Sequence, residues 1–407
     1  MKQTEALEIL KTGANVFLTG EPGAGKTYTI ELFKQYLRSQ GRSYAITAST
    51  GIAASHLNGT TIHSFCGFNI QHDLTKEQVD RIRFNHWKVE AIRPVQVLII
   101  DEVSMLDATT IEDVNKVLQA IHNTERLFGG IQVVFVGDFF QLPPVSKDKT
   151  AQFAFESSAW NNAKLQVCYL TEQHRQSDRE FLDILTNMRA GKLTEEQKQR
   201  LLACQTKEKP KTTLFTHNAD VDRINHVELL KIDSPLYSYD MTSNGVDFLV
   251  ANLKKNCLSP EKLELKVGAT VMFTRNNFNE GYVNGTIGTV VEVGPHGPVV
   301  ETADGHRVAP EKAAWEHVEH DHVKASIRQY PLRLAWAITV HKSQGMSLDS
   351  ASVDLTKAFE FGQGYVAISR VRTLEGLHLV GAGEGAFNVH PLVLAKDADF
   401  IYLSNNQ

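Results

Sequence analysis

The residues with the clearest chemistry form one glycine-rich run that ends in lysine and threonine, Gly20-Glu-Pro-Gly23-Ala-Gly25-Lys26-Thr27. Glycines let a backbone fold around an anion so that successive N–H groups point at it, Lys26 adds a positive charge, and the Thr27 hydroxyl can bind Mg²⁺. The full spacing G-x-x-x-x-G-K-[ST] therefore predicts a loop that binds a nucleoside triphosphate.

A second set of residues supplies carboxylates. Residues 97–100 form a continuous apolar run, which is typical of a strand buried on both faces of a parallel sheet, and Asp101 and Glu102 follow it. Ligands of such sheets bind at the carboxyl ends of the strands. We expect Asp101 to hold Mg²⁺, directly or through water, and Glu102 to orient and deprotonate an attacking water. The pattern predicts hydrolysis.

A third apolar run, 133–136, leads to Asp138 and then to Gln141, whose side chain is placed to touch the γ-phosphate. A helix-capping aspartate and a solvated glutamine are the plainer alternative. Two arginines farther along, Arg175 and Arg370, are candidates for the cation that stabilises charge on the transferred phosphoryl group. From spacing alone, a structural salt bridge remains open for each.

Small and hydroxyl-bearing residues follow the predicted strand 44–48, and a second such turn covers 60–65. Hydroxyls and close backbone approach suit contacts to phosphates, and His and Phe side chains can stack on bases of any sequence. An ordinary turn with a buried aromatic ring is the alternative. The candidates for nucleic-acid contact are Thr50, Gly51, His63 and Phe65.

Elements that position these residues can be predicted in both halves. The phosphate loop lies between a strand at 16–18 and a helix at 28–38, and residues 66–96 look like an irregular insertion. The second half has no second phosphate loop, but short apolar runs predict another parallel sheet, and alternating segments with glycine turns between them predict a compact antiparallel barrel. The strands expected in that second parallel sheet are 212–216, 332–337, 352–354 and 377–380.

Composition bounds the class of protein. The chain has 407 residues, enough for two large units, and its 42% hydrophobic and 22% charged residues are ordinary for a globular protein. Apolar runs stay well short of a membrane span, the first residues lack a secretory core, and we expect a cytoplasmic protein. The formal net charge of −5 argues against a tight passive coat on nucleic acid but allows an enzyme that grips a strand through a few contacts.

Cysteine and histidine usage predicts no metal site. Four cysteines are far apart and form no C-x-x-C pair, so we expect reduced core thiols. Three histidines near the end of the barrel lack a fixed ligand spacing, and a solvated, polar helix end is the preferred interpretation over a metal centre. The residues concerned are Cys66, Cys168, Cys204 and Cys257, and His317, His320 and His322.

The order of these motifs resembles that of superfamily-one helicases of the 5′→3′ branch, close to the Pif-one and RecD-like DNA helicases, over residues 1 to about 382. A segment at 178–191 is similar to the short signature of the Pif-one group, and Gln3 matches the glutamine that reads adenine. The segments that carry the resemblance are 20–27, 48–54, 61–64, 99–104, 136–144, 170–175, 339–345 and 365–372.

The resemblance implies an α/β fold with two RecA-like parallel-sheet domains, a small insertion in the first and an SH3-like β-barrel inserted in the second. The implied boundaries are 1–59 with 97–175 for domain 1A, 60–96 for the duplex-splitting subdomain 1B, 176–265 with 325–385 for domain 2A, 266–324 for the barrel 2B, and 386–407 for a C-terminal tail.

The resemblance also implies roles for residues. Thr50, His63, Phe65 and His341 would face single-stranded DNA, whereas Gln141, Arg175, Gly345 and Arg370 would sense or stabilise the γ-phosphate. ATP and Mg²⁺ are the implied cofactors, and single-stranded DNA and forks are the implied partners of a chain that acts as a monomer in DNA replication or repair. An RNA-directed translocase and a P-loop switch that recruits a partner remain as alternatives.

Overall fold

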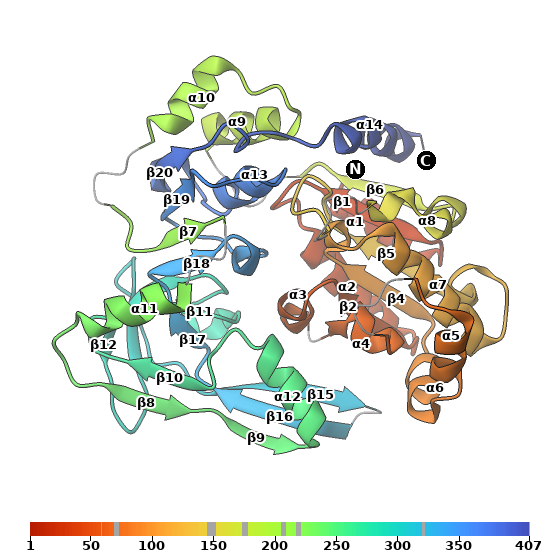
Figure 1. Cartoon of the computed structure of the whole chain (residues 1–407), viewed down its shortest axis with the longest axis horizontal. Coiled ribbons are helices and arrows are strands. Elements are labelled where there is room, and N and C mark those ends of the chain that lie inside the picture. Colours follow the sequence, from red (N-terminus) through yellow and green to blue (C-terminus); the bar gives the residue numbers. More distant parts are fainter. Residues whose placement is uncertain are drawn as a thin grey trace. The chain divides into compact units, whose positions relative to one another are not determined.

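The computed structural model describes residues 1–57, 59–68, 73–144, 152–172, 178–204, 209–216, 221–319 and 322–406. The chain forms two compact units, and each is described by itself (Figure 1). Unit 1 comprises Met1–Arg175 together with Val389–Gln407, and unit 2 comprises Gln176–Asn388. Within the described ranges, none of the helices has both the length and the apolar character of a membrane span.

A six-stranded parallel sheet forms the centre of unit 1, in the order β3-β2-β4-β5-β1-β6. Its central strands are buried on both faces, which explains why the sequence has continuous apolar runs there instead of an alternating pattern. The strands are β1 (Val16–Gly20), β2 (Tyr44–Ala48), β3 (Thr60–Thr61), β4 (Val97–Asp101), β5 (Gln132–Val136) and β6 (Gln166–Leu170).

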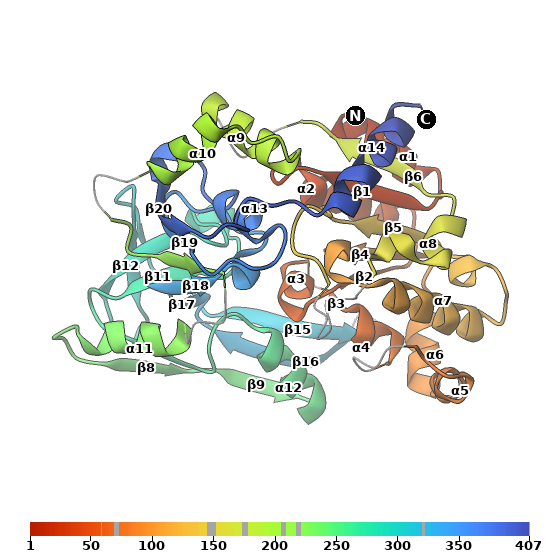
Figure 2. The same cartoon turned by 45° about the horizontal axis from the view of Figure 1, so that its top comes forward.

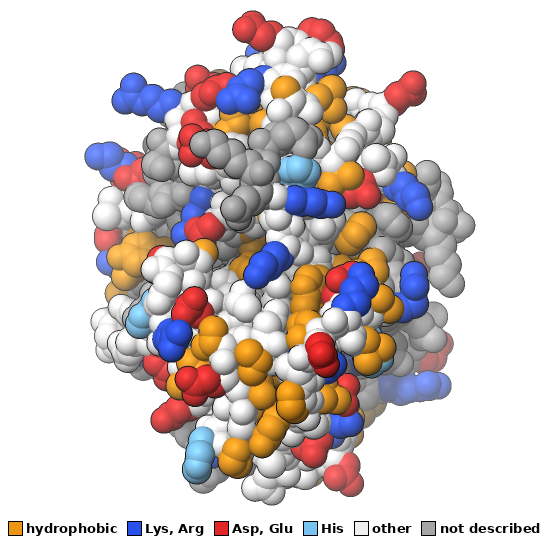
Figure 3. Space-filling model, turned by 90° about the vertical axis from the view of Figure 1, so that its left-hand side faces the viewer, with side chains coloured by type: hydrophobic (Ala, Val, Ile, Leu, Met, Phe, Trp, Pro, Cys, Tyr) orange, Lys and Arg blue, Asp and Glu red, His pale blue; other side chains and the backbone are white. Residues whose placement is uncertain are grey.

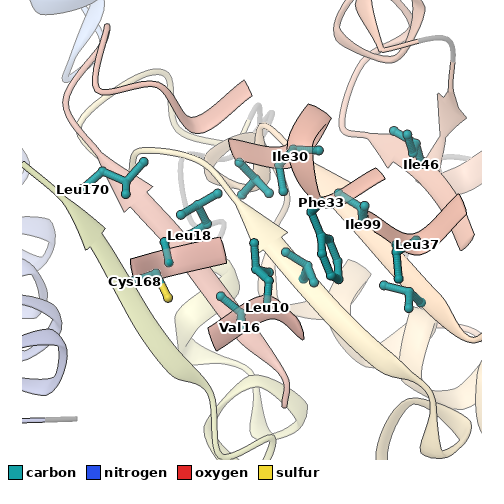
Figure 4. Packing of buried hydrophobic residues seen from close by; sticks show 14 of the residues in the cluster. Leu10, Val16, Leu18, Ile30, Phe33, Leu37, Ile46, Ile99, Cys168 and Leu170 are labelled. Atoms are coloured by element: carbon teal, nitrogen blue, oxygen red, sulfur yellow. The ribbon is translucent and has the colours of Figure 1, made fainter. Parts of the chain in front are cut away.

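Helices α1 (Gln3–Lys11) and α2 (Lys26–Ser39) pack against this sheet. Ile30, Phe33 and Leu37 recur at helical spacing in α2, and each is at most 1% exposed. Figure 4 shows them in one cluster with side chains from α1 and from several strands of the sheet. Burial of each large apolar side chain contributes about 1.5–3 kcal/mol, so this packing fixes where α2 begins and thereby the loop that precedes it.

The last helix, α14 (Pro391–Asn405), belongs to unit 1 and runs beside β6 in both views (Figures 1 and 2). The backbone N–H of Tyr169 donates to the Ser404 hydroxyl over 3.1 Å, and the Phe400 ring lies 4.9 Å from that of Phe17. The end of the chain is therefore part of the first unit's core, although the sequence alone suggested only a tail over 386–407.

Short helices, and not an irregular stretch, fill most of the region between β2 and β4, so that expectation for 66–96 was wrong. Thr75 and Asn85 cap the N-termini of the two later helices through their side chains. A capping box at Thr75 and Gln78 is the sequence signal that identifies the first of them. The helices are α3 (Gly51–His56), α4 (Ile62–Cys66), α5 (Lys76–Arg83) and α6 (His86–Ile92).

Unit 2 contains a four-stranded parallel sheet in the order β18-β7-β19-β20. The prediction of a second parallel sheet is confirmed, but the predicted strand 332–337 is wrong, because it covers parts of two strands in different sheets. The strands are β7 (Thr213–Phe215), β18 (Ala337–Thr339), β19 (Ala351–Leu355) and β20 (Leu377–Ala382).

The other described strands of unit 2 pair in antiparallel fashion. Five of them form a sheet in the order β14-β13-β12-β11-β17, three form the order β15-β16-β9, and β10 pairs with β8. Pairing thus involves strands on both sides of the predicted range 266–324. The strands are β8 (Tyr237–Asp240), β9 (Thr242–Gly245), β10 (Lys262–Leu265), β11 (Thr270–Phe273), β12 (Ile287–Glu292), β13 (Val299–Thr302), β14 (Arg307–Val308), β15 (Ala313–Glu319), β16 (His322–Gln329) and β17 (Leu332–Leu334).

The histidines near the end of the predicted barrel lie on a β-hairpin and not at a helix end, so that prediction was wrong. His317 is in β15 and His322 is in β16, whereas His320 lies outside the described residues. Among the described residues, no group of three or more His, Cys, Asp or Glu side chains is arranged to hold a metal ion.

On the face of unit 2 that Figure 3 presents, basic and acidic side chains are interspersed. This agrees with a chain whose net charge is −5 and in which a broad basic surface is not expected. The remaining helices are α7 (Ala108–His122), α8 (Ser158–Asn162), α9 (Arg179–Arg189), α10 (Glu195–Leu202), α11 (Val221–Leu230), α12 (Asp247–Asn256) and α13 (Gln363–Ile368), with 3-10 turns η1 (Val103–Met105), η2 (Leu127–Gly130), η3 (Ala154–Glu156), η4 (Phe278–Glu280), η5 (His341–Ser343) and η6 (Leu374–Gly376).

Candidate nucleotide site and nucleic-acid contacts

The glycine-rich run connects β1 to α2 and bends back on itself there. Gly20, Gly23 and Gly25 have φ values of +145°, +91° and +88°, which side-chain-bearing residues rarely adopt. A Cβ on Gly20 would also lie 2.6 Å from the carbonyl oxygen of Leu170 in the neighbouring strand. The chain can make this turn only with glycine at these positions, and the turn leads directly into the N-terminus of α2.

Lys26 lies inside the curve of the loop. Its Nζ donates to the carbonyl oxygens of Gly20 at 2.7 Å and of Glu21 at 3.2 Å. Thr27, the next residue of α2, is exposed. The loop therefore holds a cation within its curve and presents a hydroxyl at the start of the helix, as the sequence motif predicts for a phosphate and its Mg²⁺.

Gln3 lies against the same loop, close to its end. Its side-chain Nε2 donates to the carbonyl oxygen of Ala24 over 3.2 Å, and a Cβ on Gly25 would collide with it at 1.9 Å. Its backbone N–H donates to the Glu172 carboxylate over 3.0 Å. These hydrogen bonds connect the N-terminal helix to the phosphate loop. The contact of Glu172 with Gln3 could not be predicted from the sequence.

Asp101 ends β4 and Glu102 follows it, and the charge of Lys26 in the loop acts on Asp101. Burial, and then the Glu102 carboxylate, raise the pKa of Asp101 to about 7, while the Lys26 ammonium opposes that rise. The backbone N–H of Glu102 donates to Asp101 Oδ1 over 2.9 Å, and Glu102 itself has a φ of +51°. A non-glycine residue in this conformation is uncommon and occurs often at functional sites, because the surrounding structure must hold it there.

Gln141 is held by the turn that follows β5. Its backbone N–H donates to the carbonyl oxygen of Asp138 over 3.0 Å, and its side-chain Nε2 lies 3.4 Å from Asp138 Oδ2. Both residues are buried, with Gln141 6% exposed. The plainer alternative of a solvated glutamine does not fit this burial, although Asp138 does cap a turn by accepting from Phe140 N–H at 3.2 Å.

The candidates for nucleic-acid contact lie on the same edge of the sheet as the carboxylates. Register pairs Thr61 with Ala48 and Ala48 with Asp101, so the ends of β3, β2 and β4 are neighbours. Thr50 and Gly51 follow β2, where the Thr50 hydroxyl accepts from Ala53 N–H over 3.2 Å. A strand of nucleic acid at this edge would therefore touch residues adjacent to the predicted Mg²⁺ ligand.

His63 and Phe65 follow β3 in helix α4 and are half-buried. The His63 ring meets the Phe68 ring edge-on at 5.3 Å between centroids. Lys88 Nζ donates to the carbonyl oxygen of Ser64 over 2.5 Å, and this hydrogen bond connects α6 to α4. Lys88 is a second residue that the sequence analysis missed, since its partner is 24 residues away and no local pattern marks it.

Three further candidates, Arg370, Gly345 and His341, belong to unit 2. Arg370 follows α13 and is 2% exposed; its Nε donates to the carbonyl oxygen of Val366 at 2.9 Å and its Nη2 to the Ser369 hydroxyl at 3.0 Å. Gly345 has a φ of +75° and is exposed. Burial lowers the pKa of His341, and the Glu360 carboxylate opposes this effect. Arg175 lies outside the described residues.

All four cysteines are free, as the sequence predicts. Cys66, Cys168 and Cys204 are buried, whereas Cys257 is only partly so. Burial raises the pKa of Cys168 to about 12 and that of Cys257 to about 11. Thiols with such pKa values carry little thiolate at pH 7, and they pack here as small apolar side chains.

Comparison with known proteins gives consistent matches. Residues 2–199 match the family model described as PIF1-like helicase, and residues 248–293 match the model described as DNA helicase Pif1, 2B domain. The ATP-dependent DNA helicase Pif1 of Psychrobacter sp. is 39% identical over 472 residues, covering 99% of this chain and 71% of the relative. That of Bdellovibrio bacteriovorus is 35% identical over 97% of this chain and 90% of its own length.

Solved structures are similar over almost the whole chain. Bacteroides sp. Pif1 in complex with ADP-AlF4 is 28% identical, with a TM-score of 0.87 over 99% of this chain and 97% of its own. Bacteroides Pif1 bound to single-stranded DNA is 29% identical, with a TM-score of 0.68 over the same shares. A further match, with a TM-score of 0.68 and 30% identity over the same shares, is a structure of forked double-stranded DNA unwound by two coordinating Pif1 helicases.

Proposed function

Since this chain belongs to the family of PIF1-like helicases, we infer that it is an ATP-dependent DNA helicase that moves 5′→3′ along single-stranded DNA and unwinds duplex or structured DNA. The observation that carries this inference is the shared edge of the first sheet. The phosphate loop follows β1 at this edge, and the carboxylates at the end of β4 lie next to the residues after β2 and β3 that we assign to DNA.

Hydrolysis is assigned to residues of unit 1. We propose that the loop N–H groups and Lys26 neutralise the β- and γ-phosphates, that Gln3 reads the adenine, and that Glu102 takes the proton of the attacking water. Gln141 would contact the γ-phosphate and so sense whether it is bound. Hydrogen bonds to Asp138 hold both the backbone and the side chain of Gln141 in position.

Mg²⁺ fits the donor set at this edge. The Thr27 hydroxyl and the Asp101 carboxylate are oxygen ligands of the kind that this ion prefers, and phosphates and water supply the rest. Burial favours the protonated form of Asp101, and a divalent cation favours the charged form. When bound, the ion neutralises charge on the β- and γ-phosphates and orients them for attack.

Two arginines are proposed to complete the site. Arg370 and Arg175 would stabilise charge that develops on the γ-phosphate, and Gly345 would let the backbone approach it closely. His341, in unit 2, is assigned to the DNA strand with Thr50, Gly51, His63 and Phe65. Alternating grip by the two units on phosphates of the strand, driven by binding and hydrolysis of ATP, would then produce movement.

We propose that one copy of the chain is sufficient for ATP hydrolysis, since every residue assigned to it is present in a single chain. In the similar structure with forked DNA, two Pif1 helicases act together. The number of copies of this chain that bind a fork is therefore measured separately, by sedimentation of the complex. A cytoplasmic location is also proposed, and its support is the set of four free cysteines, which is usual in a reducing compartment.

The direct test is strand displacement with duplexes that carry either a 5′ or a 3′ single-stranded tail. A 5′→3′ helicase displaces the strand only from the 5′-tailed duplex and only with ATP and Mg²⁺. Displacement from the 3′-tailed duplex alone would reverse the assigned direction. A protein that displaces neither while still hydrolysing ATP would favour the switch that recruits a partner.

A further inference from the structure

Arg333 is a buried charge in the middle of β17. The backbone of β17 pairs with β11, where Arg333 is opposite Met272. Leu332 belongs to the apolar cluster on one face of this sheet, and since side chains alternate along a strand, Arg333 points to the other face. Arg333 as a whole is 8% exposed to solvent, and its side chain alone is 10% exposed.

The guanidinium of Arg333 has little compensation for its charge. Among the residues that the structure describes, the carboxylate oxygen paired with it is Asp222 Oδ1 at 3.8 Å, and the Asp222 side chain is 82% exposed to water. Arg333 Nε is buried and has no hydrogen-bond acceptor among the described residues. Arginine cannot lose its proton at any physiological pH, so the charge stays in place.

A second cation lies beside the first. Burial lowers the pKa of Lys342, the Arg333 charge lowers it further, and Asp222 opposes both effects. Lys342 is half-buried in η5, where its backbone N–H donates to the Thr339 hydroxyl over 3.2 Å. Counting described residues only, the cluster formed by Arg333, Lys342 and Asp222 carries two positive charges and one exposed carboxylate.

A buried guanidinium with so little compensation and a half-buried ammonium beside it are unfavourable in a folded protein unless an anion compensates them. The fork of an arginine and the point charge of a lysine together match an oxyanion that has several acceptor oxygens. Lys342 adjoins His341, which the proposed function assigns to the DNA strand. The available oxyanion with that geometry at that place is a phosphate of the strand's backbone.

We propose that Arg333 and Lys342 hold one backbone phosphate of the single strand, Arg333 from the buried side and Lys342 from the rim. This inference rests on the proposed function, because it takes single-stranded DNA as the ligand. It adds to the DNA contacts a residue outside the segments 339–345 and 365–372, and it gives the buried arginine of β17 a role in binding.

The test compares Arg333→Met with the parental protein by titrating fluorescent oligothymidylate at several salt concentrations. Methionine keeps most of the volume and removes the buried charge, so we expect an unchanged or higher melting temperature. Affinity should fall about tenfold, since a hydrogen-bonded charge is lost. The slope of log K against log salt should become shallower by about 0.7, the value of one phosphate contact on a single strand.

Arg307→Met is the matched control, because Arg307 lies in the same sheet but is 63% exposed and paired with Glu301 at 2.9 Å. Its slope should equal that of the parental protein. Lys342→Met gives a second, independent reading and should also make the slope shallower by about 0.7.

The possible results distinguish the phosphate site at Arg333 from the proposed binding of single-stranded DNA on which it rests. A parental protein that does not bind oligothymidylate would overturn both. Salt-dependent binding by the parental protein together with a parental slope in Arg333→Met would overturn only the phosphate site. A lowered melting temperature with unchanged affinity per folded molecule would show that Arg333 is structural.

Discussion

At the scale of single residues, function follows from charges placed around one loop. Burial and then the Glu102 carboxylate raise the pKa of Asp101, and the Lys26 ammonium opposes this rise, so both charges act on the Asp101 carboxyl. These residues could be predicted from the sequence because each belongs to a short local pattern whose spacing fixes its geometry. Lys88 and Arg333 could not be predicted, because their neighbours come from distant parts of the chain.

Glu102→Gln tests the general base. The amide cannot accept the proton of water, so we expect ATP to bind with nearly parental affinity and kcat to fall by at least about 10²-fold. Lys26→Ala should instead abolish turnover through loss of phosphate neutralisation. Nucleotide affinity and steady-state hydrolysis are measured on both, with the exposed Glu125→Gln as control. Hydrolysis near the parental rate in Glu102→Gln would remove that residue from the mechanism.

Arg370→Ala tests the cation supplied by unit 2. Its charge is needed chiefly in the transition state, so kcat should fall by about 10³-fold or more while nucleotide affinity changes little. Because Arg370 is buried and hydrogen-bonded to its own turn, its melting temperature is measured as well.

Arg372→Ala is the matched control for Arg370, since Arg372 is 45% exposed and paired with Asp349 at 2.6 Å. A surface pair of this kind contributes about 0–1 kcal/mol, so both activity and stability should stay near parental values. A destabilised Arg370→Ala protein with parental activity per folded molecule would support the structural salt-bridge alternative.

At the scale of elements, continuous apolar runs predicted the strands of unit 1, since burial on both faces leaves a pattern that no surface element shares. The helices in 66–96 were missed because they are short and because exposed aromatic residues obscure their pattern; Phe84 and Trp87 are each 79% exposed. Helix α14 was missed because its hydrophobic residues show little periodicity around the helix axis.

His390 gives α14 a dependence on pH. Its Nδ1 accepts from Leu392 N–H over 3.2 Å, which caps the helix, and its ring meets Phe153 at 5.0 Å. Burial lowers its pKa, against the opposing charge of Glu156. The unfolded chain therefore takes up a proton first as pH falls below about 6.5, and the stability that the neutral ring contributes is lost in that range.

His390→Asn should remove this loss, because asparagine keeps an acceptor for the cap but does not titrate. Urea unfolding at pH 7.5 and pH 5.5 measures the effect: the parental protein should lose more stability between the two values than the variant does. Equal losses in both proteins would show that the ring does not couple to α14.

At the scale of the whole molecule, strand pairing in unit 2 predicts what deletion of the barrel would do. Removing residues 268–318 would take away β11 from β17 and β15 from β16, and would expose the remaining members of the apolar cluster, among them Leu263 and Leu332. We expect loss of soluble expression, compared with the full chain under the same conditions. A soluble deletion protein that hydrolyses ATP would show that the rest of the chain folds without these strand pairs.

We propose that ATP hydrolysis at the first sheet is coupled to a DNA strand bound at the same edge. The most direct measurement is the steady-state rate of ATP hydrolysis with single-stranded DNA, with RNA of the same sequence, and without nucleic acid. Strong stimulation by DNA, and weaker stimulation by RNA, is the predicted result. A rate that neither nucleic acid changes would contradict the claim and leave a nucleotide-dependent switch as the better description.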